Sequence, residues 1–117
     1  MIEKTVYDYL SQALAISVCL EEPEQNDPPR RTFVLIQKTG SSTENHITTA
    51  TLAIQSYADS LYHAAELNET VKQAMLDMIT LDTINKVTLV SDYEFTKVST
   101  KQPRYQAVFE IVYYTED

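Results

Sequence analysis

The stretch that decides the fold is IQSYADSLYHAAELNETV, residues 54–71. An alternating segment ends here and an amphipathic segment begins, with only YADS at 57–60 between them. The side-chain period changes from two, typical of a strand with one covered face, to 3.6, typical of a helix. Asp59 and Ser60 stand at this change, and either side chain can accept a hydrogen bond from an N–H of the first helical turn. The stretch therefore predicts a strand joined directly to a helix, without a glycine loop.

The predicted helix runs from residue 60 to about residue 79, and the predicted strand before it covers residues 46–57. The apolar stripe of the helix consists of Leu61, Ala64, Ala65, Val71, Met75, Met78 and Ile79. The charged residues away from this stripe are Glu66, Glu69, Lys72 and Asp77. In the strand, one face carries Ala50, Leu52 and Ile54, and the other carries Thr49, Thr51, Ala53 and Gln55. The first face is expected in the core, and the second in water or against a partner.

Outward from this stretch, further elements follow from the same patterns. A helix is predicted over 3–15, where Val6, Leu10, Ala13 and Leu14 form one stripe flanked by Ile2 and Tyr9. Strands are predicted over 16–20, 32–38, 86–95 and 104–114, with loops or turns at 21–31, 39–45 and 96–103. The order α-β-β-β-α-β-β predicts a single α+β domain over residues 1–117. We expect a mostly antiparallel sheet of four to five strands with two helices packed on one face.

Alternation in the last two strands predicts which side chains share a face. In 86–95 these are Val87, Leu89, Tyr93 and Phe95, and in 104–114 they are Tyr105, Ala107, Phe109, Ile111 and Tyr113. The opposite face of the last strand carries Val108, Val112 and Tyr114. Tyrosine is enriched at protein interfaces, but amphipathic strand ends also commonly carry it. Contact of this second face with a partner and an ordinary half-covered sheet both fit the pattern.

Composition and charge exclude several classes of protein. The 117 residues are 44% apolar and 22% charged, as expected for one folded domain. The net charge of −8, from 17 carboxylates against 9 Lys and Arg, argues against a protein that clamps a nucleic-acid duplex. No apolar run reaches membrane-spanning length, and the start MIEKT does not resemble a signal peptide. With one cysteine, the chain is expected to reside in a reducing cytoplasm.

Residues with the potential for chemistry are few, and we predict no catalytic, cofactor-binding or metal site. Cys19 lies in an apolar run, and neither His46 nor His63 has a second ligand at metal-binding spacing. The carboxylates Glu21, Glu22, Glu24 and Asp27 fall in a proline-rich loop, where nothing would raise a carboxyl pKa for acid–base work. With Gly40 as the one glycine, a phosphate-binding loop is excluded. We also find no cluster of polar residues at the predicted core positions.

Three segments together are similar to a known family: FVLIQKTGSS at 33–42, ENHITTATLAIQSYADSLYHAAELNETVKQAM at 44–75, and SDYEFTKVSTKQPRYQAVFEIVYY at 91–114. They resemble the small tail-terminator or tail-completion proteins of long-tailed bacteriophages and prophages, also called minor capsid or head–tail joining proteins. The resemblance extends from about residue 3 to residue 114. The loops at 21–31 and 96–103 belong to segments that vary in this family.

The resemblance implies a structural virion protein and not an enzyme. Such proteins form a ring, usually of six copies, on the end of the finished tail tube. The ring stops tube growth and presents the surface that docks on the filled head. The implied partners are further copies of the chain, the tail tube protein and the head–tail connector, with DNA passing through the lumen. The implied location is the virion neck, after assembly in the cytoplasm of the bacterial host.

Three alternatives remain open, one of them a standalone adaptor domain. Another is a head-side connector or stopper of the phage neck, which would contact the portal assembly. The third is a small α+β enzyme or ligand-binding domain that uses a pocket between sheet and helices. For the ring, we expect an acidic lumen that lets DNA slide without sticking.

Overall fold

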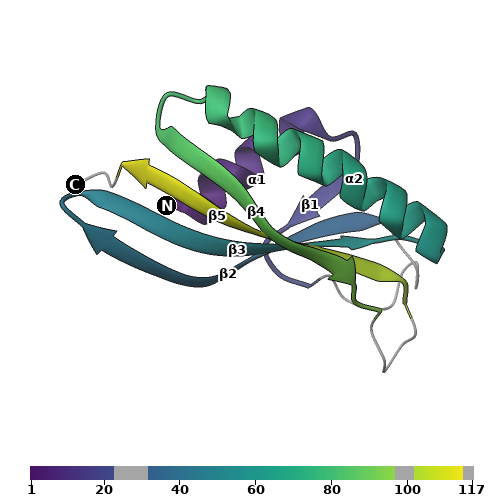
Figure 1. Ribbon diagram of the computed structural model, residues 1–117. Helices are drawn as coiled ribbons and strands as arrows, with labels where there is room; N and C mark the ends of the chain where they lie inside the picture. Colours follow the sequence, from purple (N-terminus) through teal and green to yellow (C-terminus); the bar gives the residue numbers. More distant parts are fainter. Residues whose placement is uncertain (23–31, 97–101, 115–117) are drawn as a thin grey trace.

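The computed structural model describes residues 1–22, 32–96 and 102–114 and confirms the predicted α+β class (Figure 1). The helices are α1 (Ile2–Ala13) and α2 (Leu61–Asp77), and a 3₁₀ turn, η1 (Met78–Thr80), extends α2. The strands are β1 (Ser17–Cys19), β2 (Phe33–Glu44), β3 (Ile47–Tyr57), β4 (Ile84–Glu94) and β5 (Arg104–Tyr114). They form one sheet in the order β1-β2-β3-β5-β4, with β1 parallel to β2 and every other pair antiparallel.

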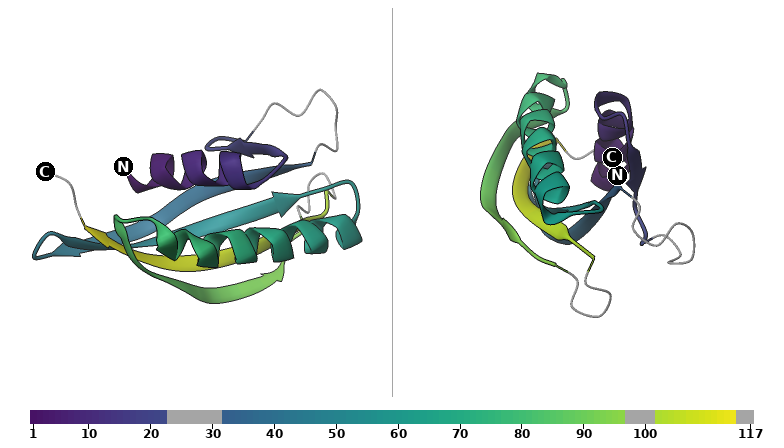
Figure 2. Two further views of the ribbon diagram at one scale, coloured as in Figure 1. Left: turned by 90° about the horizontal axis from the view of Figure 1, so that it is seen from above. Right: turned by 90° about the vertical axis from the view of Figure 1, so that its right-hand side faces the viewer.

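Both helices lie on the same face of the sheet, side by side and along the strands (Figure 2). The core between the two layers contains Ile2, Val6 and Leu10 from α1, Leu14 directly after it, Ala64, Val71 and Met75 from α2, and apolar residues of the central strands. Ser60 accepts a hydrogen bond from the backbone N–H of His63 at 3.1 Å and so caps α2 at its start. The strand-to-helix junction read from residues 54–71 is therefore confirmed.

The buried stripe of α2 differs from the predicted one. Leu61 and Ile79, at the two ends of the predicted helix, are exposed, and the buried positions are Ala64, Asn68, Val71, Met75 and Met78. These positions recur at steps of four and three residues, as one helix face requires. Because Asn68 is polar, the apolar pattern alone did not include it in the stripe.

The predicted turn at residues 39–45 is wrong. Strand β2 continues through this segment to Glu44, and the chain reverses at Asn45 and His46, which have φ values of 53° and 65°. Two successive residues with positive φ match a type I′ turn, whose twist suits a two-residue hairpin. Gly40 lies inside the strand, next to a bulge at Thr39, between the pairs Lys38–Leu52 and Gly40–Thr51. The glycine therefore accompanies a bulge and not the reversal of the chain.

A second bulge corrects the predicted faces of β4. Val87 and Leu89 face the helices as expected, because they lie opposite Ile111 and Phe109. Val90 is an extra residue between Leu89 and Ser91, so the alternation shifts by one position. Tyr93 consequently lies opposite Gln106, on the sheet face away from the helices, and not on the core face that strict alternation predicts.

Candidate functional site

The sheet face opposite the helices is the main candidate site, and we call it the open face. Among the described residues no helix packs on it (Figure 2). It carries Phe33, Leu35 and Gln37 of β2, Gln55 and Tyr57 of β3, Tyr93 of β4, and Arg104, Gln106, Val108, Glu110, Val112 and Tyr114 of β5, with the residues between them in register. Val108, Val112 and Tyr114 thus lie on the predicted face. The first two are half-buried and Tyr114 is 56% exposed.

One end of the open face, which we call the network end, is a chain of side-chain hydrogen bonds across three strands. Gln55 donates to the Oε1 of Gln106 at 2.8 Å, and Gln106 donates to the hydroxyl of Tyr93. The Tyr57 hydroxyl donates to the Oε1 of Gln55 at 2.9 Å. Gln55, Tyr57 and Gln106 are all buried, although no helix of the described residues covers them. The side-chain amides of Gln55 and Gln106 therefore make hydrogen bonds to each other and to tyrosines in place of water, and these bonds fix the side-chain conformations.

Arg104 joins this network to an aromatic cluster. Its Nη1 donates to the Tyr57 hydroxyl at 2.8 Å, and its Nε donates to the backbone carbonyl of Phe95. The guanidinium lies 4.1 Å from the centre of the Phe95 ring, within the range of a cation–π contact. On the far side, Phe33 stacks on Tyr57 with ring centres 4.3 Å apart. The Arg104 guanidinium is therefore held by a backbone carbonyl, an aromatic ring and a hydroxyl group.

The other end of the open face, which we call the hairpin end, has a different character. Here β2 and β3 extend together beyond the helices (Figure 1). Every residue from Gln37 to Glu44 is exposed. Ile47, 38% exposed, lies opposite Tyr114 on β5, and Thr49 lies opposite Val112. Threonines, one isoleucine and one tyrosine therefore present a mixed surface without a side-chain network, as expected for a contact region.

Charge divides between the two sides of the molecule. On the open face, Glu44 and Glu110 balance Lys86 and Arg104. The excess of carboxylates in the described part of the chain lies on the helices, on the connections and on the helix-facing side of the strands. Self-association of a chain with a net charge of −8 meets least repulsion at its neutral regions.

The thiol and the two histidines do not come together. Cys19 is half-buried against Phe33, Leu35 and Tyr57, consistent with the predicted packing role. His46 lies in the exposed hairpin turn, and not at the start of a strand as predicted. His63 lies in the first turn of α2, where its Nδ1 is 2.6 Å from the Oδ1 of Asp59. The structure thus brings no nucleophile and base together among these three residues.

The pair of His63 and Asp59 shifts the pKa of both partners. The hydrogen bond and the charge of Asp59 raise the pKa of His63 above its ordinary value of 6.5. The hydrogen bond from His63 lowers the pKa of Asp59 below 3.8. Both side chains are more than half exposed, so water screens the pair. The pair fastens the start of α2 locally and does not resemble a buried catalytic dyad.

The carboxylates of the proline-rich segment do not form a site in the described residues. Glu21 and Glu22 are exposed, whereas Glu24 and Asp27 lie outside the described residues. Among residues 1–22, 32–96 and 102–114, no group of three or more His, Cys, Asp or Glu side chains is placed to hold a metal ion. The nearest arrangement to a charged cluster is Lys72, which contacts both Asp92 of β4 and Glu69. It fastens α2 to the edge of the sheet.

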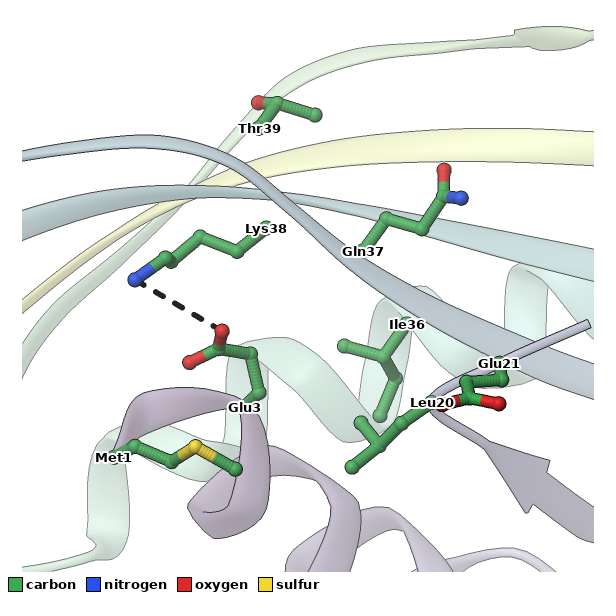
Figure 3. Close-up of a pocket in the computed structure, with 8 residues that line it drawn as sticks. All are labelled: Met1, Glu3, Leu20, Glu21, Ile36, Gln37, Lys38 and Thr39. Carbon is green, nitrogen blue, oxygen red and sulfur yellow. Dashed lines mark ion pairs between the residues drawn. The ribbon is translucent and has the colours of Figure 1, made fainter.

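One hollow of about 580 Å³ lies where β1 ends beside β2 (Figure 3). It is lined by Met1 and Glu3 of the N-terminal segment, by Leu20 and Glu21 after β1, and by Ile36–Thr39 of β2. Figure 3 shows Lys38 reaching toward Glu3, with 3.8 Å between Nζ and Oε2, while Gln37 and Thr39 point to the other side of the strand. We call this hollow the notch. It lies between the start of α1 and the outer edge of β2.

The sequence predicted no cluster of polar residues at the core positions, and the buried polar cluster that the structure shows lies on the other face of the sheet. Gln55 and Gln106 cluster on the open face, and Ser56 and Asn68 are buried on the helix side. Asn68 donates to Asp92 at 2.6 Å, whereas its Oδ1 and the Ser56 Oγ have no hydrogen-bond partner in the described part of the chain. Strand alternation had placed Gln55 on the correct face, but nothing in the one-dimensional pattern showed that Gln106, Tyr93 and Arg104 would converge on it.

A search against models of known protein families and a search of curated protein sequences each found no match to this chain. None of the helices that the structure describes is long and apolar enough to cross a membrane. The candidate site therefore has to be interpreted from its own geometry and from the resemblance of the three segments described above.

Proposed function

We propose that this protein is a tail terminator of a long-tailed phage or prophage. It forms a ring, expected to contain six copies, on the end of the tail tube, stops tube growth and provides the surface that docks on the head. The observation that carries the proposal is the family resemblance of residues 33–42, 44–75 and 91–114. These segments make up most of β2, all of β3, α2 to Met75, and β5 with the end of β4, and the four strands are neighbours in one sheet.

The geometry supports a ring component in two ways. The sheet has two non-equivalent outer strands, β1 with the uncovered part of β2 on one side and β4 on the other. A ring needs two different contact surfaces on every copy, because its interfaces are heterologous. The sheet also has one layer of helices and one open face, so a copy can be stiffened from one side and still present the other.

Electron microscopy of tubes grown from the matching tail tube protein, with and without this protein, tests the proposal. Capped tubes with an extra terminal ring and arrested growth are expected. Unchanged growth would contradict the terminator function and leave the head-side connector as the better candidate. Gene order separates the same two functions, since a terminator gene normally lies just upstream of the tail tube gene.

We further propose that carboxylates of this chain line the channel through which DNA passes. The structure offers two separate sets, one on the exposed side of α2 with Glu66 and Glu69, and one on the open face with Glu44 and Glu110. Reversal of Glu66 and Glu69, or of Glu110 without Glu44, to lysine distinguishes the two sets, because only carboxylates in the channel should slow DNA passage and reduce infectivity when reversed. If neither reversal has an effect, the acidic channel is wrong.

A ligand-binding domain is the second candidate function, and the notch is the observation that favours it. Its lining includes Lys38, Glu3 and Glu21, so a ligand would meet charges of both signs. Glu21→Gln, at a lining residue outside the paired strands, should change the affinity of such a ligand but not the capping of tubes, which separates this candidate from the terminator.

A further inference from the structure

We infer that neighbouring copies in the ring join their sheets, with β4 of one copy pairing antiparallel with the outer edge of β2, residues 36–44, in the next copy. This inference rests on the proposed function, since it names the contact by which the ring closes. Four observations support the pairing: the direction of the strands, the length of the unpaired edge of β2, the positions of two bulges, and the charges of the residues that would lie opposite one another.

Strand direction permits this pairing. Successive antiparallel pairings in the order β2-β3-β5-β4 make β2 and β4 run in opposite directions. Two copies placed side by side in the same orientation therefore bring β4 of one antiparallel to β2 of the other. The contact joins two different edges, so it can repeat around an axis and close.

The uncovered edge has a defined length. Strand β1 covers the outer edge of β2 only from Phe33 to Leu35. Beyond Leu35, no strand of the described residues pairs with that edge as far as Glu44, and the edge residues from Gln37 onward are exposed. Backbone N–H and C=O groups on such an edge are a template for another strand.

One register satisfies the faces, the charges and the bulges together. It places Glu44 opposite Lys86 and Ser42 opposite Thr88 on the open face, and Thr43 opposite Val87, Ser41 opposite Leu89 and Lys38 opposite Asp92 on the helix-facing side. Opposite residues share a face of the sheet in every one of these pairs. The two ends carry residues of opposite charge.

The bulges match in the same register. The extra residue of β2, Thr39, and one of the two extra residues of β4, Val90, both fall between the pairs Ser41–Leu89 and Lys38–Asp92, whereas the other, Asn85, lies before Lys86 and outside the contact. Each strand has two residues between these pairs, so the pairing register is the same on both sides of the bulges. Glu94, the last residue of β4, then lies opposite Ile36, the first position beyond β1.

The two ends of the contact differ in their surroundings. At the notch, Lys38 has Glu3 at 3.8 Å in its own chain, and Glu21 also lines the space. The incoming Asp92 is already paired with Lys72 of its own chain, so this end adds little net attraction. At the hairpin end, Glu44 and Lys86 are exposed and have no ion pair within the described chain, which makes this end the place to test charge.

Disulfide trapping tests the register directly. In a Cys19→Ser background, Ser42→Cys with Thr88→Cys should give crosslinked dimers and a ladder of higher species on oxidation of ring-capped tubes. Within one chain the two positions are separated by β3 and β5, too far for a disulfide, so every crosslink joins two copies. The matched control is Ser42→Cys with Ser91→Cys, on the same strands and face but about 10 Å out of register.

Charge exchange is the second test. Glu44→Lys or Lys86→Glu alone should weaken assembly about three- to ten-fold, as expected for like charges at an exposed contact. The double variant should recover to within about two-fold, as read by sedimentation and tube capping. Both residues are exposed, so the fold is expected to survive each change.

The outcomes separate this inference from the proposed function. If rings cap the tubes but the 42–88 pair does not crosslink, or crosslinks no better than the 42–91 pair, the strand pairing is wrong and the terminator function stands. If the double charge variant fails to recover, the register is wrong. If the protein neither binds tube ends nor associates with itself, the proposed function fails and this inference fails with it.

Discussion

The two ends of the open face are made from the same strands but differ in what their side chains do. At the network end, Gln55 and Gln106 are buried and hydrogen-bonded to each other, and Tyr57 is closed off between Phe33 and Arg104. At the hairpin end, Ile47 and Tyr114 are exposed and Thr49 is half-buried. Side chains of the network end therefore stabilise the fold, whereas those of the hairpin end are available for contact. Substitutions at the two ends can test this difference.

The largest expected difference comes from the removal of one apolar side chain at each end. Phe33→Ala should lower the free energy of unfolding by about 3–5 kcal/mol, because Phe33 is 5% exposed and stacks on Tyr57. Ile47→Ala should cost less than about 1 kcal/mol, because that side chain is already partly in water. Urea denaturation of both variants measures the difference. Equal losses would mean that the two ends are equally packed.

The second-largest expected effect comes from the removal of a hydrogen-bonded side chain. Gln55→Ala removes the acceptor of the Tyr57 hydroxyl and the donor to the Oε1 of Gln106, and the loss of these two buried hydrogen bonds should cost about 1–3 kcal/mol. Thr49→Ala, on the same strand and face, serves as the control and should change stability by less than about 0.5 kcal/mol. Thermal unfolding monitored by circular dichroism compares them. A control as damaging as Gln55→Ala would remove the distinction between the ends.

The hairpin turn should be open to stabilisation. His46 has a φ of 65°, a conformation that costs a non-glycine residue about 1 kcal/mol or more. His46→Gly gives the Asn-Gly pair favoured in type I′ turns and should raise the free energy of unfolding by up to about 1 kcal/mol. His46→Val should lower it. A stabilising valine would show that the turn has a different backbone conformation.

The smallest expected effect is the pH dependence of the pair at the start of α2, which lies away from both ends. Because the folded pKa of His63 is raised, its contribution is complete below about pH 6.5 and is lost as pH rises through the folded value. Because the folded pKa of Asp59 is lowered, its contribution is present above about pH 3.8 and is lost as pH falls through the folded value. In Asp59→Asn, NMR titration should show the pKa of His63 falling back toward 6.5. An unchanged value would assign the shift to another cause.

The sequence predicted most of the fold because apolar periodicity is strong in both helices and in β2, β3 and β5. The predictions failed where a single residue changed the local backbone conformation or the alternation of a strand. The lone glycine, Gly40, indicated a turn that the structure places at Asn45 and His46, since Asn and His also tolerate positive φ. The extra residue Val90 moved Tyr93 to the open face, and alternation cannot reveal such an insertion. The network end depends on side chains from β3, β4 and β5 meeting in space, which no single segment encodes.

Strand β1 has a consequence beyond its three residues. An exposed edge that accepts one neighbour can also accept an unrelated strand, and uncontrolled growth of that kind leads to aggregates. Because β1 pairs in parallel with Phe33–Leu35, it shortens the unpaired edge of β2 and prevents another strand from pairing with these three residues. Three residues are enough for this, because they pair with the part of β2 nearest to Thr32 and leave the unpaired edge to begin at Ile36.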